Sequence, residues 1–337
     1  MFNIKTGRRT LLFLGFFILT ITSMAQVRIS SPYSRYGIGL LRRGDYNITF
    51  SSMGGISNAI RTPYNVNFAN PASYSAIDST SFLFDAGITT DITTMKSSTA
   101  SQQAMYGSLA HLIFGFPLTS WWKSSLGVLP YSDVGYNILQ EQTSDNIGRT
   151  QTLYEGSGGI NQAFWGSGFN VAKGLSLGVN FIYYFGTMNR LRKVYFPDSS
   201  ATYINSNLEN RIKVSDLAFD LGAQYAYTMK SGLVLNAGLT FAFDNKMNAR
   251  REYIANTFQG SIGGNENFLD TVAYSPEEKG YILVPAHMGL GLVLEDPGHW
   301  LIGADYDFQN WQKFEMFGYQ DSLMNSFEVR VGGQYRP

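Results

Sequence analysis

An alternating pair of segments between Gln162 and Gly186 is the feature that most constrains the fold of this chain. In the second segment, apolar side chains occupy every other position over 175–185, and small or polar side chains lie between them, with Ile182 as the one exception. The first segment alternates in the same way, and the two meet at the turn Ala172-Lys173-Gly174. Since successive strand residues point to opposite faces, this pattern predicts a β-hairpin with one apolar face and one small, polar face.

The same alternation recurs to the end of the chain and predicts ten strands. The eight further strands lie near 82–89, 112–118, 126–138, 217–225, 233–244, 282–294, 300–308 and 327–335. Short turns near 119–123, 172–174, 228–232 and 295–299 alternate with longer polar stretches near 97–102, 141–151, 193–208, 253–278 and 309–325. Outer-membrane barrels have short turns at one end and long loops at the other, whereas a soluble β-sandwich has no reason to sort its loops. We therefore predict an all-β fold, a transmembrane antiparallel β-barrel over residues 80–337.

The N-terminus predicts export. A basic region over residues 5–9 precedes an apolar run over 11–21, and Ser23-Met24-Ala25 supplies the small residues of a cleavage site. This is the organisation of a secretory signal peptide, and the run is too short to span a bilayer as an anchor. We expect cleavage after residue 25 and a location in the outer membrane of a Gram-negative cell.

The composition excludes several classes of function. Net charge is zero, so nothing predicts a nucleic-acid partner, and the absence of cysteine removes disulfides, thiolate metal sites and a lipoprotein anchor. Aromatic residues reach 15% and mean hydropathy is only −0.10. This combination suits membrane strands that are apolar at every second residue.

Residues 26–79 interrupt the alternating pattern. The segment is rich in Ser, Asn, Gly and Tyr and has no sustained strand or helix period. Its many apolar and aromatic residues argue against plain disorder. We expect a compact segment that packs against the barrel.

Charged residues on the polar faces of the strands are predicted to line the lumen. On the lipid face a basic side chain would cost about 2–4 kcal/mol at the bilayer midplane, and an acidic one somewhat less. The lumen-lining candidates are Asp85, Asp220, Asp244, Asp305, Asp307 and Arg330. Asp305 and Asp307 share a face and could bind a cation, but pairing with Arg330 on the next strand is the structural alternative.

No catalytic machinery is evident. His111, His287 and His299 have no adjacent serine or paired carboxylate, although a triad can assemble from distant positions. The glycine-rich stretch 156–168 follows no phosphate-loop pattern. We predict no enzyme activity, no metal and no cofactor.

Two short motifs resemble the FadL/TodX-type family of outer-membrane channels for long-chain fatty acids and aromatic hydrocarbons. Ser-Met-Gly-Gly at 52–55, followed by Asn-Pro-Ala at 70–72 just before the first strand, is similar to the end of that family's N-terminal hatch. The stretch 306–314, YDFQNWQKF, is similar to its late-strand Asn-Trp-x-x-Phe signature. The resemblance implies a hatch over 26–79 that plugs a fourteen-stranded barrel, and passive uptake of a hydrophobic small molecule.

In that family a kinked third strand opens a lateral portal. Pro130 lies in the third predicted strand, where a proline forces a bulge or removes a ladder hydrogen bond, unless it lies beyond the hydrocarbon zone. The resemblance therefore implies gating roles for hatch residues Asn70, Pro71 and Ala72 and for portal residues Pro130, Ser132 and Asp133.

Other functions stay open at this stage. The stretch 31–40, SPYSRYGIGL, departs from the fatty-acid channels and indicates a divergent branch. Some family members, the PorV-like proteins, serve protein secretion, so this barrel could instead dock protein partners through loops 193–208 and 253–278. An open porin for polar solutes is the third alternative. Outer-membrane lipid is the expected surrounding in each case.

Ten strands are fewer than the fourteen that the resemblance implies. We therefore expect the strands near 80–92 and 326–336 not to pair with each other. About four further strands, on the order of 60–100 residues, are expected beyond Pro337.

Overall fold

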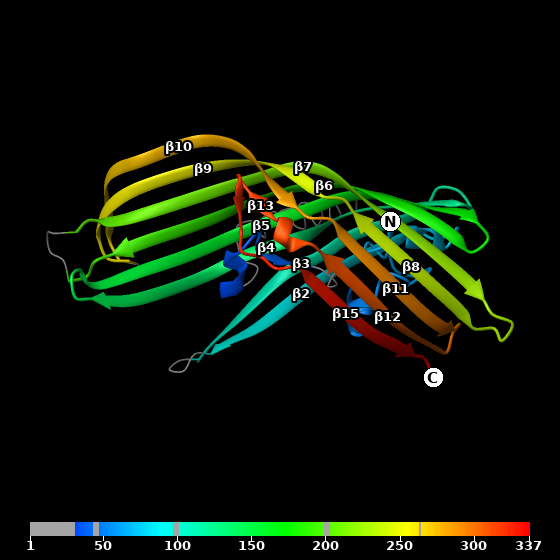
Figure 1. The fold of residues 1–337 in the computed structure, drawn as a ribbon. Coiled ribbons are helices and arrows are strands. Elements are labelled where there is room, and N and C mark those ends of the chain that lie inside the picture. Colours follow the sequence, from blue (N-terminus) through cyan, green and yellow to red (C-terminus); the bar gives the residue numbers. More distant parts are fainter. Residues whose placement is uncertain (1–30, 43–46, 97–100, 199–202, 263) are drawn as a thin grey trace, which may run out of the picture.

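The computed structural model describes residues 31–42, 47–96, 101–198, 203–262 and 264–337. The predicted signal peptide lies outside these residues. Among them, no helix has the length and apolar character needed to cross a membrane. They form one long antiparallel sheet that curls around the N-terminal residues (Figure 1), which confirms the all-β prediction.

The sheet contains fifteen strands. The long ones are β2 (Leu83–Lys96), β3 (Ser101–Pro117), β4 (Trp122–Ser144), β5 (Gly148–Ala172), β6 (Leu175–Tyr195), β7 (Asn205–Thr228), β8 (Val234–Ala242), β9 (Asn245–Gly260), β10 (Glu266–Val284), β11 (His287–Asp296), β12 (Trp300–Gln309) and β15 (Ser326–Tyr335). The two-residue strands are β1 (Leu40–Leu41), β13 (Glu315–Met316) and β14 (Tyr319–Gln320).

Two pairs of consecutive strands each form one interrupted strand across the sheet, which we call a path. β7 pairs with β9 along 205–214 and with β8 along 220–228, so β8 and β9 are two halves of one path. β11 and β10 continue next to them, paired with β8 and β9 respectively. Counted as paths, the long strands of the described residues number ten, as the alternation predicts.

The predicted long loops are wrong in extent. Residues 253–278 belong mostly to the β9–β10 hairpin, and 141–151 and 193–208 largely extend β4 to β7. β5 alone has 25 residues, about 80 Å at 3.3 Å per residue, far more than the ~10 residues of a membrane strand. These outer portions are mostly polar, and their apolar residues, such as Phe258, Phe268 and Leu269, do not alternate regularly, so they lack the pattern by which a half-buried strand is recognised. In Figure 1 they extend to the left of the shorter β8, β11, β12 and β15.

The two faces of the wall differ as predicted along the shorter strands and the neighbouring part of β6. Phe181, Leu290 and Val329 are exposed on the outward face, while Asn180 and Asp305 are buried on the inward face. Aromatic residues stand at both ends of this outward band, with Trp300 and Tyr335 near the short turns and Phe308 and Phe327 at the far end.

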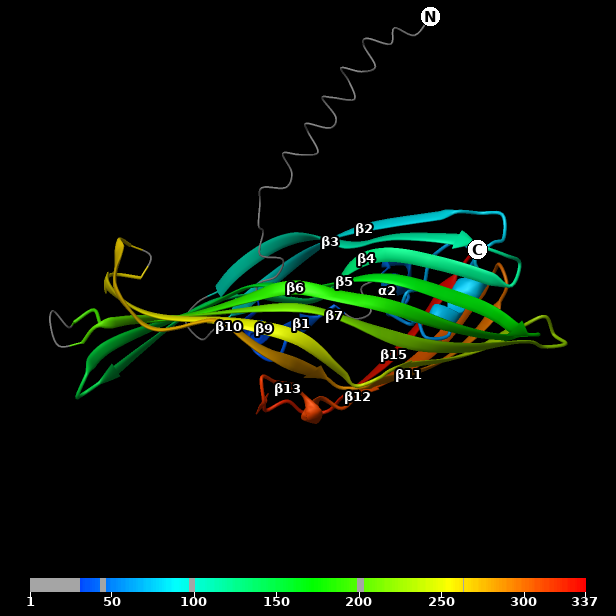
Figure 2. The ribbon, with the colours of Figure 1, turned by 90° about the horizontal axis from the view of Figure 1, so that it is seen from above.

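The N-terminal segment, residues 31–42 and 47–82, lies inside the curl. It includes η2 (Pro32–Arg35), α2 (Ile48–Ser52) and η3 (Pro71–Ala76), and Figure 2 shows α2 between β2–β4 on one side and β11, β12 and β15 on the other. A Cβ at Gly178 would lie 2.2 Å from the carbonyl carbon of Pro71, and one at Gly222 only 2.1 Å from Asn70 Oδ1. The glycines on the inward face therefore allow the backbone of this segment to approach the wall closely.

The sheet is not closed within the described residues. β2 pairs only with β3, and β15 pairs only with β12. The expected gap between the first and last strands is present.

Candidate functional site: a pocket at the broken strands

The hydrogen-bond ladder along β7 is interrupted where the neighbouring strands bend, between β8 and β9 and between β10 and β11. Residues 215–219 of β7 lie between the last pair with β9, Val214↔Ala249, and the first pair with β8, Asp220↔Ala242. The first bend falls at 243–244, between β8 and β9. The second falls at Pro285, between β10 and β11, where the ring nitrogen cannot donate to a ladder.

Side chains replace the missing ladder hydrogen bonds. Asp216 Oδ2 accepts from the Asn248 amide at 2.8 Å, and Asp244 Oδ1 accepts from the Ala286 amide at 2.7 Å. On the inner side, Gln309 Nε2 donates to the Pro285 carbonyl at 2.7 Å. Because these groups have partners, the break is a stable feature of the wall.

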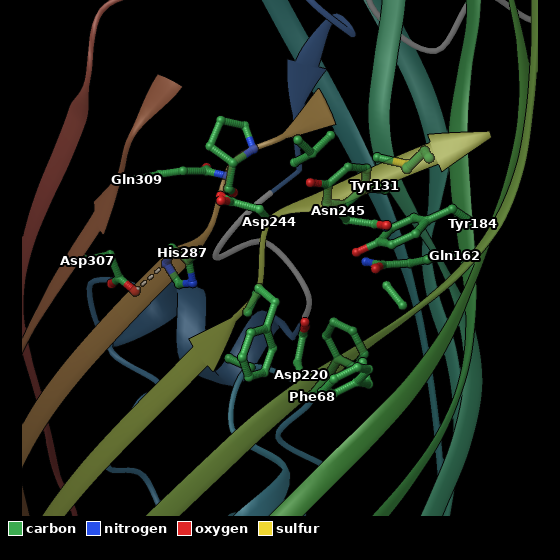
Figure 3. Close-up of a pocket in the computed structure, with 18 of the residues that line it drawn as sticks. Phe68, Tyr131, Gln162, Tyr184, Asp220, Asp244, Asn245, His287, Asp307 and Gln309 are labelled. Carbon is green, nitrogen blue, oxygen red and sulfur yellow. Dashed lines mark hydrogen bonds and ion pairs between the residues drawn. The ribbon is translucent and has the colours of Figure 1, made fainter. Parts of the chain in front are cut away.

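A cavity of ≈ 190 Å³, which we call the kink pocket, lies behind this break (Figure 3). Its lining combines the N-terminal segment, the lumen wall and the edges of the break. The main contributors are Asn58, Phe68, Tyr131, Gln162, Tyr184, Leu217, Phe219, Asp220, Phe243, Asp244, His287, Asp307, Gln309 and Arg330.

An ion cluster forms one wall of the kink pocket. Arg330 on β15 contacts Asp307 on β12, so the predicted ion pair is present. His287 Nε2 lies 2.9 Å from Asp307 Oδ1, and Asn58 Nδ2 donates to both Asp307 oxygens at 3.3 Å. The carboxylate therefore joins three elements that are distant in sequence.

Asp305 has a different role from Asp307. Its Oδ2 accepts from the backbone amides of Ser57 at 2.6 Å and Asn58 at 2.9 Å, which fixes the N-terminal segment to β12. Across the part of the chain that the structure describes, no group of three or more metal-binding side chains is present.

Two buried glutamines present unpaired polar atoms to the pocket. Gln162 and Gln309 are each 1% exposed. Gln162 Nε2 and Gln309 Oε1 find no hydrogen-bond partner among the described residues. Buried polar atoms are nearly always paired, so these two atoms are unusual; both are closed to water in this structure, and a ligand in the pocket reaches them only if the glutamine side chains rotate.

The predicted hatch residues do not line the kink pocket, although Ala69, directly before them, does. Asn70 caps η3, its Oδ1 accepting from the Ala72 amide at 3.0 Å, and its Nδ2 donates to the Asn58 carbonyl at 2.7 Å. Asn70, Pro71 and Ala72 are buried against the glycines of β6 and β7. They form the contact between the N-terminal segment and the wall.

The predicted portal residues lie at a second interruption. The β4–β5 ladder shifts register between Pro130 and Ser132, and β4 pairs with β3 only as far as Val128. Beyond that point β1 takes the place of β3, with Leu40 opposite Asp133.

Arg42, directly after β1, joins both sides of this interruption. Its Nε donates to Asp133 Oδ2 on β4 at 2.7 Å, and its Nη atoms donate to Asp91 Oδ2 on β2 at 3.1 Å. Burial opposes the charged guanidinium, but these two carboxylates outweigh it and raise the pKa of Arg42.

The six predicted lumen-lining residues divide into two groups. Asp220, Asp244, Asp307 and Arg330 line the kink pocket, whereas Asp85 and Asp305 do not. Asp85 accepts from Asn47 at 2.5 Å and lies 2.9 Å from His111 Nε2. The sequence pattern did not indicate Gln162 or Gln309, and it indicated His287 only as a histidine without catalytic neighbours. The sequence feature that could have indicated this pocket is Pro285, which interrupts an apolar strand segment.

The comparisons with solved structures define the class of fold. The chain is similar to the *Pseudomonas putida* toluene transporter TodX (TM-score 0.52, 16% identity, covering 92% of this chain and 81% of that chain). It is also similar to a *Pseudomonas aeruginosa* FadL homologue (0.51, 13%, 86% and 76%) and to the *Ralstonia pickettii* toluene transporter TbuX (0.50, 12%, 87% and 79%). At these identities the likeness shows the FadL-like fold alone.

The family itself follows from the sequence. The BamG family model matches residues 8–337, and the chain belongs to this family. No curated protein matches the chain.

Proposed function

We propose that this protein is an outer-membrane barrel that lets small hydrophobic molecules cross passively, with its N-terminal segment acting as a hatch. The apolar outward band supports a position in lipid, because the 9–10 residues of β8, β11, β12 and β15 suit a tilted membrane strand. The proposal involves no catalysis and no cofactor.

The kink pocket is the observation that carries this proposal, because it extends from the break in the wall to the N-terminal segment. An apolar cavity of about 150 Å³ in another protein binds benzene, so ≈ 190 Å³ suits a single aromatic ring. A long-chain fatty acid exceeds this volume and would extend out of the cavity. The resemblance implies two ligand classes, long-chain fatty acids and aromatic hydrocarbons, and the cavity volume favours the aromatic compounds.

The contacts of the N-terminal segment favour a plugged channel over an open porin. Arg61 donates to Ser176 and Gln224 on the wall at 3.0 and 3.1 Å, although burial lowers the pKa of this guanidinium and Glu295 only partly offsets that. A porin for polar solutes would need a water path through the space that η3 occupies.

Uptake of labelled toluene tests the proposal. Cells that express the protein should take up toluene faster than cells without it, while palmitate uptake stays unchanged. A variant with the pocket filled, Ala218→Trp, should reduce toluene uptake, and Ala223→Trp on the outward face of the same strand is its control. Equal toluene uptake with and without the protein would contradict the channel.

One observation favours the second candidate, a barrel that docks protein partners. The outer part of β10 exposes Phe268, Leu269, Val272 and Tyr274, with Val272 69% exposed, in a hairpin that extends past the apolar band. Exposed apolar side chains outside lipid often mark protein contacts. If Val272→Asp abolished the co-purification of a secretion component while toluene uptake was absent throughout, the docking function would replace the channel.

A further inference from the structure

The outer rim of the kink pocket belongs to the outward face of the wall. Leu217, Phe219 and Phe243 line the pocket and are also 70%, 47% and 46% exposed. The rings of Phe219 and Phe243 lie 5.1 Å apart between centroids, and those of Phe241 and Phe243 lie 4.8 Å apart. If the outward band lies in lipid, as proposed above, one end of the pocket is apolar and faces the bilayer.

The inner end of the pocket is polar, and rotation of its two buried glutamine side chains would offer both kinds of hydrogen-bonding atom. The unpaired Nε2 of Gln162 is a donor, and the unpaired Oε1 of Gln309 is an acceptor. Figure 3 shows these two side chains on different sides of the pocket. A ligand with an apolar body and a polar head matches this division better than a pure hydrocarbon, because its head supplies a missing partner.

The charged side chains around the pocket determine which charge the polar head group of a ligand can carry. Four carboxylates line it, those of Asp220, Asp244, Asp307 and Glu328, against one guanidinium, that of Arg330, and one imidazole, that of His287. Arg330 and His287 both contact Asp307, and Lys313 approaches Asp244 at 3.6 Å from the exposed side. Even with Lys313 included, carboxylates outnumber the permanent cations by four to two. A carboxylate head would enter against this excess of negative charge.

We propose that the kink pocket binds small amphiphiles with one aromatic ring and an uncharged or cationic head, and disfavours carboxylates. The head lies among the glutamines and acidic residues, and the ring lies against Phe219 and Phe243 at the break. The position of the pocket's rim in lipid rests on the proposed function. The proposal assigns to that channel a ligand class other than fatty acids.

Three matched probes test the ligand class directly on the purified, detergent-solubilised chain. Benzyl alcohol, benzylamine and benzoate share one ring and differ in the charge of the head. Saturation-transfer NMR should detect the alcohol and the amine, with affinities at least about tenfold above that of benzoate. Benzoate that binds as tightly as benzyl alcohol would overturn the proposal without the use of any variant.

Variants locate the binding and separate it from the channel function. Ala218→Trp fills the pocket and should weaken benzyl alcohol binding about tenfold or more, while Ala223→Trp on the outward face leaves it unchanged. Gln162→Leu removes one donor at nearly constant volume and should weaken the alcohol several-fold. Asp220→Asn should raise benzoate affinity selectively. If Ala218→Trp binds the alcohol like the parent, the site assignment is wrong. If binding is lost but toluene uptake persists, the channel stands and the pocket is not on its path.

Discussion

Two interruptions in the described wall, one beside Pro130 and one beside Pro285, differ in what occupies them. Beside Pro130 the ladder between β3 and β4 ends, but β1 pairs with β4 there and Arg42 joins the carboxylates of Asp133 and Asp91. Beside Pro285 the break leaves a cavity, lined by two glutamines with unpaired atoms. A proline in a strand therefore marks a gap in hydrogen bonding, and the rest of the chain decides whether that gap is filled or open.

Removal of the N-terminal segment should have the largest effect, because it changes both interruptions. Deletion of residues 26–79 would remove β1 and Arg42 from the first interruption and the inner wall of the kink pocket from the second. We expect a plugged pore to become a leaky one in planar-bilayer conductance. Unchanged conductance would show that the segment is not a plug.

A single glycine substitution should loosen the same segment. A side chain at Gly222 would meet Asn70 Oδ1 at 2.1 Å, so Gly222→Val should displace η3 and raise conductance. Gly107→Val is the control, since the nearest atom to its Cβ would be 4.0 Å away. If the two variants behave alike, the glycine contact does not hold the segment in place.

Loss of Arg42 should open only the first interruption. Arg42→Ala would leave Asp133, which is fully buried, without this cation, and breaking such a pair costs about 3–5 kcal/mol. We expect a lower unfolding temperature and faster amide exchange in β1, partly rescued by Asp133→Asn. Arg35→Ala, which removes an exposed hydrogen bond and a cation–π contact, both to Tyr36, should change neither.

Replacement of the two prolines should produce the smallest effects, and these should differ. Pro285→Val should allow partial repair of the ladder at the kink pocket and slow toluene uptake by a few-fold. Pro130→Val should leave uptake close to that of the parent, because β1 already occupies that interruption. A larger loss from Pro130→Val would place the route at β4 and reverse the comparison.

The alternation in the sequence was sufficient to predict the all-β fold, the ten paths and the inward position of residues such as Asp305 and Asp307. It failed at 253–278, because the apolar residues there, such as Phe268, Leu269 and Val272, do not alternate regularly and leave no apolar period to detect. The kink pocket could not be predicted either. Gln162 and Gln309 are ordinary polar residues in sequence, and only the long-range pairing of β7 with both β8 and β9 makes them neighbours of one cavity.

The most direct test of the pocket is a crystal structure of the protein soaked with 4-bromobenzyl alcohol, with the bromine located by its anomalous signal. The account predicts one strong bromine peak in the kink pocket, near Phe219 and Phe243, and its loss in crystals of Ala218→Trp. A peak between β3 and β4 beside Pro130, with none in the kink pocket, would contradict it.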